Sequence, residues 1–304
     1  MPSRRAQPSF GLAEDFLKNN FELNDNNIVL KECYLNDNYE IEQNGENPEV
    51  CIIYFSSNGL YFPNTIEVFN ENIICNNRYE WKVNRVITDK IVKREIFVRD
   101  IYKQWYIIGI NHKISSVDQL VSFLKEQTKD CKKIITVGNS AGGYISTLVG
   151  CFLSAEIIFN FSGQFSLEHT IEKNYFLNKY KEDSYYNKYY NITEVVKNSN
   201  VDIFYFYPAK VEGDIMQASL IKDIDNVKCF AFDSSVHGDT MYSINLPFLI
   251  SYDKEKLFSL YEKYKNRIIS PFDFSVTIIG FFKTLKFFIT DKVKKTYRKY
   301  FKKK

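Results

Sequence analysis

The sequence has 304 residues, which is enough for one large domain or two small ones. Hydrophobic residues make up 45% of the chain and aromatic residues 16%, so it is able to bury a sizeable core. The six cysteines form no CxxC pair and have no His at ligand spacing. This argues against a structural zinc site and against a dense disulfide framework, and we expect no metal.

Charge is distributed unevenly along the chain. The net charge is +3, but residues 281–304 contain ten Lys or Arg and one Asp, a local net charge of +9. The preceding 280 residues therefore carry about −6, so a mildly acidic body precedes a strongly basic tail. The first residues, MPSRRAQPSFG, contain no apolar stretch of signal-peptide length. We expect residues 1–20 to form a disordered arm and the protein to be reduced and cytoplasmic.

Short apolar runs predict the first strands of the chain. Val50–Phe55 reads as a buried strand that ends in a polar turn. Residues 72–76 and 96–100 are predicted to be further short strands. Trp105–Ile110, with the sequence WYIIGI, predicts a clearer buried strand.

From Ser115 onward, helices and strands are expected to alternate. Ser115–Gln127 is amphipathic, and Ser115 and Asp118 have the spacing of a capping box. Residues 168–200 are rich in Tyr, Asn and Lys and predict a helical insertion. Strands are expected at 132–137, 156–163, 201–208 and 226–232, and helices at 141–155 and 214–224. The alternation indicates an α/β domain over residues 21–270, with a mostly parallel central sheet and helices on both faces.

The glycine-rich stretch IITVGNSAGGYIS contains the candidate nucleophile. Residues 138–142, Gly-Asn-Ser-Ala-Gly, fit G-x-S-x-G between a predicted strand and a predicted helix, which is the context of a nucleophile elbow at Ser140. Gly138 and Gly142 supply the small neighbours that such a sharp turn needs. The Ala141 N–H is then expected to form part of an oxyanion hole at the helix N-terminus. The alternative is an ordinary tight turn with Ser140 as an N-cap.

A serine nucleophile needs a base, and the chain has three histidines. His237 lies in a loop directly after the last predicted strand of the sheet, where the order Ser, acid, His requires the base. His112 precedes the elbow and His169 begins the insertion, so both are interpreted as structural or surface residues.

The acid is expected in the loop after the strand at 201–208. This loop offers Asp214, 23 residues before His237, and Glu212 as the alternative. Asp202 starts a strand at the wrong end of the sheet, and Asp233 is a lesser candidate close to the histidine.

The second oxyanion donor should come from the loop after an early strand. The sequence YFSSNG occupies that place, and the backbone N–H of Ser57 or Asn58 is the candidate. The His-Gly pair found in this loop in lipases is replaced here by Ser56-Ser57-Asn58-Gly59.

Together, GNSAG with Ser140, EGD with Asp214 and VHGD with His237 resemble the α/β-hydrolase superfamily over roughly residues 48–245. The resemblance implies a covalent acyl-enzyme on Ser140 that forms and is discharged in two steps. The superfamily does not by itself name a substrate.

Residues 204–241 are also similar to proteins of bacterial capsule and surface-polysaccharide gene clusters, some of them capsule O-acetyltransferases. That similarity implies an O-acetyltransferase that takes acetyl from acetyl-CoA and passes it to a sugar hydroxyl. The alternatives are a carboxylesterase or deacetylase with the same triad, acting on a small ester, and a non-catalytic binding protein of the same fold.

The basic tail, residues 271–304, predicts an amphipathic helix over 278–301. Its apolar run is interrupted by lysine too early to span a bilayer, and a basic amphipathic helix suits an anionic membrane surface. We therefore expect residues 281–304 to hold the protein at the inner face of the membrane. The alternative is that 281–289 packs on the protein's own core. No nucleic-acid partner is expected, because the body is acidic and no known motif is present.

Overall fold

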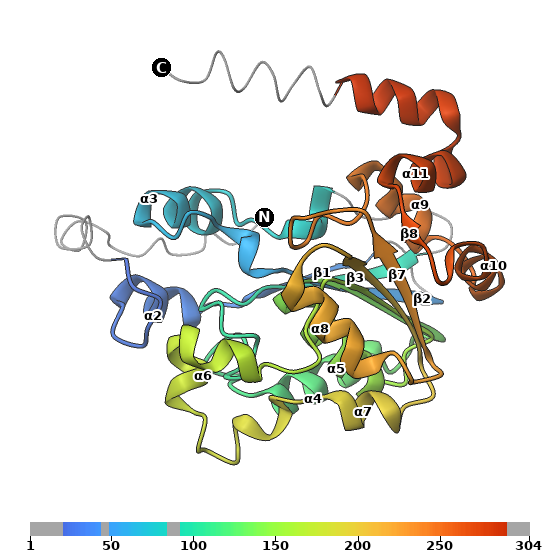
Figure 1. Ribbon diagram of the computed structural model, residues 1–304. Helices are drawn as coiled ribbons and strands as arrows, with labels where there is room; N and C mark the ends of the chain where they lie inside the picture. Colours follow the sequence, from blue (N-terminus) through green and yellow to red (C-terminus); the bar gives the residue numbers. More distant parts are fainter. Residues whose placement is uncertain (1–20, 44–48, 84–91, 291–304) are drawn as a thin grey trace.

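A computed structural model describes residues 21–43, 49–83 and 92–290, and the expected arm at 1–20 lies outside these ranges. An eight-stranded sheet forms its centre, in the order β1-β3-β2-β4-β5-β6-β7-β8 (Figure 1). Only β1 is antiparallel to its neighbour among these strands, and the other pairs are parallel. The strands are β1 Tyr39–Gln43, β2 Val50–Phe55, β3 Val92–Val98, β4 Lys133–Asn139, β5 Ile157–Phe161, β6 Asp202–Pro208, β7 Val227–Phe232 and β8 Ile268–Ile269.

Helices cover both faces of the sheet, as the sequence predicts (Figure 1). One layer contains α4 Val117–Thr128, α5 Ala141–Phe152, α7 Thr193–Lys197 and α8 Glu212–Ile221. The opposite layer contains α9 Leu246–Ile250, α10 Lys254–Tyr264 and α11 Pro271–Ile279. The remaining helices are α2 Ile28–Tyr34, α3 Ile66–Phe69 and α6 Tyr175–Lys179. The mostly parallel α/β architecture is therefore confirmed.

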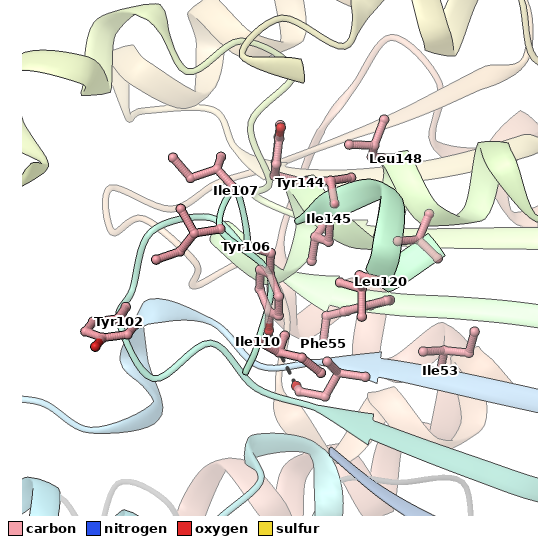
Figure 2. Close-up of a cluster of buried hydrophobic side chains, with 14 of the residues drawn as sticks. Ile53, Phe55, Tyr102, Tyr106, Ile107, Ile110, Leu120, Tyr144, Ile145 and Leu148 are labelled. Carbon is pink, nitrogen blue, oxygen red and sulfur yellow. Dashed lines mark hydrogen bonds between the residues drawn. The ribbon is translucent and has the colours of Figure 1, made fainter. Parts of the chain in front are cut away.

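Strand β2 shows how the sequence builds two cores at once. All six of its residues are buried, as expected for a strand covered on both faces. Successive side chains point to opposite faces, so Cys51, Ile53 and Phe55 join one apolar cluster while Val50, Ile52 and Tyr54 join the other. Figure 2 shows the first cluster, in which Ile53 and Phe55 lie with Leu120 of α4 and with Tyr144, Ile145 and Leu148 of α5.

The strand predicted at Trp105–Ile110 is wrong. The segment is a series of turns, and Trp105 and Tyr106 have positive φ angles of 55° and 62°. The Asp100 carboxylate organises it by accepting hydrogen bonds from the backbone N–H groups of Tyr102, Gln104 and Tyr106 at 2.6–3.1 Å. Burial raises the pKa of Asp100 to about 6, against the opposing effect of these hydrogen bonds. The apolar composition of this segment therefore reflects its burial, and its backbone is not extended.

The strand predicted at 72–76 is also wrong, because residues Asn70–Cys75 form a π-helix that continues α3. Ile66, Phe69 and Ile73 are buried at spacings of three and four, which is the period of a helix face. Thr65 caps α3 by accepting from the Val68 N–H. The predicted helix start at Ser115 is shifted by one residue, because Ser116 is the N-cap of α4 and accepts from the Gln119 N–H.

The insertion is helical as expected, with short helical turns from Glu168 to Lys197. Phe176, Leu177 and Ile192 join the larger apolar core, so the segment is packed against the body.

The single helix predicted over 278–301 is broken. Helix α11 ends at Ile279, and Gly280 with φ +85° separates it from a second helix over residues 281–290. Residues 291–304 lie outside the described part of the chain. Among the helices that the structure describes, none has the length and apolar character needed to cross a bilayer.

Candidate active site

Ser140 occupies a strained turn between β4 and α5. Its φ of 53° and ψ of −121° lie outside the regions that L-residues normally occupy, at a cost of about 1–3 kcal/mol. A Cβ on Gly138 would lie 1.9 Å from the Gly142 carbonyl oxygen, and one on Gly142 would lie 2.3 Å from the Phe55 carbonyl oxygen. Gly138 is therefore required by the turn itself, and Gly142 is required for α5 to start this close to the end of β2.

The serine side chain makes the hydrogen bond of a nucleophile and not that of a cap. Ser140 sits at the N-cap position of α5, but its side chain accepts no bond from the helix. Its Oγ instead lies 2.9 Å from His237 Nε2. The alternative interpretation of Ser140 as a simple cap therefore does not describe this turn.

Asp214 completes a chain of hydrogen bonds from carboxylate to serine. His237 Nδ1 lies 2.9 Å from Asp214 Oδ2 and 3.1 Å from Oδ1. Asp214 lies in the first turn of α8, which begins at Glu212, two residues before the helix start that the sequence predicts. The Asp214 side chain is 2% exposed and that of His237 is 43% exposed. A buried carboxylate thus holds an imidazole whose other nitrogen faces the serine and solvent.

The loop after β7 brings His237 to the elbow. Gly238 has φ +79°, and a Cβ there would lie 3.4 Å from the side chain of Asn139, the residue before the serine. The loop from β7 therefore packs directly on the elbow at the carboxyl ends of the parallel strands, where α/β proteins place their sites.

The other predicted candidates lie elsewhere. Glu212, the alternative acid, is exposed, and Asp214 is the carboxylate that lies at hydrogen-bond distance from His237 Nδ1. Asp202 pairs with Lys254 at 2.7 Å, and Asp233 pairs with Lys210. His112 and His169 are exposed on the surface.

The two predicted sources of the second oxyanion donor differ in their hydrogen bonds. The Ser57 N–H donates to Glu80 Oε2 at 2.6 Å, and its Oγ donates to Oε1 at 3.1 Å. Within the described residues, the N–H groups of Asn58 and Ala141 have no hydrogen-bond acceptor. Neither of these two N–H groups is therefore engaged by a protein acceptor in this part of the chain, whereas that of Ser57 is.

Glu80 is a site residue that the sequence analysis missed. It lies in the 3₁₀ turn Glu80–Val83, whose sequence carries no motif. Burial raises the pKa of its carboxyl, and the hydrogen bonds from Ser57 act in the opposite direction. Only the contact between two segments that are far apart in the sequence brings this carboxyl to the site.

A cavity of about 470 Å³ opens beside His237. Its wall combines carboxyl, amide and hydroxyl groups with aromatic rings, a mixture typical of pockets for polar organic ligands. The Asn139 Oδ1 atom is buried and has no hydrogen-bond partner among the residues that the structure describes. The lining residues are Glu80, Trp81, Asn139, Phe161, His237, Gly238, Asp239, Thr240, Met241, Tyr242, Ser243, Leu246 and Phe287. No cluster of three or more metal-ligating side chains occurs in the described ranges.

Neither a protein-family model nor a curated protein matches the sequence. Solved structures with a similar chain trace include the capsule O-acetyltransferase of Neisseria meningitidis serogroup A, at 13% identity and a TM-score of 0.45, covering 75% of this chain and 89% of that one. An esterase from Thermogutta terrifontis matches at 12% identity and a TM-score of 0.42, covering 80% and 89%. An α/β-hydrolase enzyme from a Moroccan lagoon metagenome matches at 12% identity and a TM-score of 0.41, covering 76% of this chain and 96% of that one.

Similarity at this level does not identify a substrate, so the fold is assigned on the chain's own topology. The serine turn follows the central strand β4, the acid follows β6 and the histidine follows β7. This order of elements on a mostly parallel sheet is that of one known architecture. The chain has the α/β-hydrolase fold.

Proposed function

We propose that this chain is a serine-dependent acyl-transfer enzyme. The observation that carries the proposal is the continuous set of hydrogen bonds from Asp214 through His237 to Ser140, on a strained turn beside a cavity. Backbone strain of this kind is found at functional sites. Asp, His and Ser with these hydrogen bonds form the catalytic triad of serine acyl-transfer enzymes.

The geometry fits a two-step reaction. His237 Nε2 takes the hydroxyl proton as Ser140 Oγ attacks the acyl carbon, and the oxyanion meets the N–H groups of Ala141 and Asn58. The imidazolium then protonates the leaving group as its bond to the acyl carbon breaks. In the second step an acceptor hydroxyl gives its proton to His237 and attacks the acyl-Ser140 carbon. That proton returns to Ser140 Oγ when the ester bond breaks.

The specific reaction that we propose is O-acetyl transfer from acetyl-CoA to a hydroxyl of a bacterial capsular or surface polysaccharide. The resemblance of residues 204–241 to capsule-cluster proteins supports it. A second candidate is a carboxylesterase or deacetylase, in which water takes the place of the acceptor. The 43% exposure of the His237 side chain favours this candidate, because water reaches the base.

The intact-protein mass after a short pulse of acetyl-CoA without acceptor tests the proposal. The wild type should gain one acetyl group and Ser140→Ala none, and added polysaccharide should discharge the adduct faster than water does. Ser140-dependent hydrolysis of p-nitrophenyl acetate without an adduct from acetyl-CoA would favour the esterase. No adduct, together with hydrolysis no faster than in buffer without the protein, would overturn both and leave a non-catalytic binding protein.

A further inference from the structure

The helix over residues 281–290 has an inner face that belongs to the wall of the site. Thr284 is fully buried, and its Oγ1 donates to Ser275 Oγ of α11 at 3.1 Å. The ring of Phe287 lies 5.4 Å from that of Tyr242, and both residues line the cavity beside His237. The helix is therefore fixed to the loop that follows the candidate base.

The outer face of the same helix carries exposed apolar side chains together with a lysine. Phe282 is 85% exposed and Ile289 is 53% exposed, and their spacing of seven places them on one side of the helix. Lys286 lies between them on this side and is also exposed. Figure 1 shows the helix at the edge of the molecule, beyond α11 and away from the sheet. Large exposed apolar side chains that share one side of a helix indicate a surface that binds a partner.

The charge around this face identifies the kind of partner. Lys283 and Lys286 are exposed on the helix, and the sequence that follows, residues 291–304, adds eight Lys or Arg against one Asp. Apolar side chains mixed with many basic ones match an anionic lipid surface, where the rings enter the headgroup boundary and the cations meet phosphates. The acidic body, with a net charge of about −6 over residues 1–280, opposes binding along the length of a nucleic acid.

We propose that helix 281–290 binds an anionic membrane surface and thereby places the cavity beside His237 at the membrane. Phe287 and Phe282 lie on opposite faces of one short helix, so the wall of the cavity and the lipid-binding face are separated by the width of that helix. An acceptor that is held at the membrane, such as a lipid-linked glycan, is the class of substrate that this placement favours.

Flotation of the full chain with vesicles tests the proposal. One set of vesicles contains phosphatidylcholine alone, and the other contains phosphatidylcholine mixed with phosphatidylglycerol. The wild type should float only with the mixed vesicles and should be released by high salt. Phe282→Ser/Ile289→Ser should lower the partition coefficient about tenfold or more, because two exposed apolar side chains leave the headgroup boundary. Lys283→Gln/Lys286→Gln should lower it about 30-fold.

Matched variants separate this surface from general effects. Leu35→Ser removes a side chain that is 61% exposed at the C-cap of α2, and Lys113→Gln/Lys125→Gln removes two exposed charges elsewhere. Both should float as the wild type does, and so should Ser140→Ala, since lipid binding requires no chemistry at the site. Three results would overturn the proposal. The wild type would float with neither kind of vesicle, the helix variants would float as the wild type does, or the protein would bind a DNA duplex more tightly than the mixed vesicles.

Discussion

Replacing Asp214 by Asn tests how the acid acts on His237. The carboxylate oxygens lie 2.9 and 3.1 Å from Nδ1, and the Asp214 side chain is 2% exposed, so solvent is largely excluded from the carboxylate. Asn conserves the volume, but its NH₂ group is a donor. A donor facing Nδ1 favours the tautomer with its proton on Nε2, and that nitrogen then faces Ser140 Oγ without a lone pair to accept its proton.

The expected loss is large. In serine triads this change lowers kcat by about 10⁴, which corresponds to about 5.4 kcal/mol in activation free energy. The assay is hydrolysis of p-nitrophenyl acetate at saturating ester, with a thermal melt to verify folding. Glu212→Gln is the matched control, because Glu212 is an exposed carboxylate two residues away on the same helix. Its kcat should equal that of the wild type.

Two outcomes would refute this reasoning. One is a folded Asp214→Asn protein whose kcat lies within tenfold of the wild-type value, since the buried carboxylate would then have no part in orienting the imidazole. The other is an equal loss in Glu212→Gln, which would mean that the general negative charge of the α8 N-terminus matters and the geometry does not.

Two further predictions concern stability. Gly142→Ala should lower the free energy of unfolding by about 1–3 kcal/mol, because its Cβ would lie 2.3 Å from the Phe55 carbonyl oxygen. Gly213→Ala in helix α8 should raise it by about 0.5–1 kcal/mol, since a Cβ there would have no atom within 4 Å. Urea unfolding measures both variants, and a Gly142→Ala protein more stable than Gly213→Ala would contradict the packing at the elbow. The raised pKa of Asp100, about 6 against 3.8 when unfolded, means that the unfolded chain loses this proton first as the pH rises. Its contribution to stability is therefore complete below about pH 4 and decreases by about 3 kcal/mol by pH 7. The difference in unfolding free energy between wild type and Asp100→Asn should shift by this amount across that range, and a difference that stays constant with pH would contradict it.

The parts of the fold and site that sequence reasoning found are those with a local signal. The elbow needs small residues at fixed offsets between a strand and a helix, and residues 133–152 carry that whole pattern. The chain offers only three histidines, so the order of elements was enough to single out His237. The geometry then distinguishes Asp214 from Glu212, which spacing alone left open.

The parts that sequence reasoning missed depend on contacts between distant segments or on a single backbone angle. Trp105–Ile110 has the composition of a strand, but hydrogen bonds to Asp100 turn its backbone. Glu80 reaches the site only because its carboxyl bonds Ser57, 23 residues earlier. Gly280 separates α11 from the helix over residues 281–290, in which Phe287 lies in the cavity wall and Phe282 is exposed. A continuous helical projection was unable to show this division.

The hydrogen bonds from Asp214 through His237 should make Ser140 a nucleophile, and this can be tested without knowledge of the substrate. A fluorophosphonate reacts with an activated serine and adds a phosphonyl group that intact-protein mass detects. The wild type should gain one adduct, which peptide mapping places on Ser140, Asp214→Asn should react far more slowly, and Ser140→Ala should gain none. A wild-type protein that stays unlabelled, or a label that persists in Ser140→Ala, would contradict the assignment of Ser140 as the nucleophile.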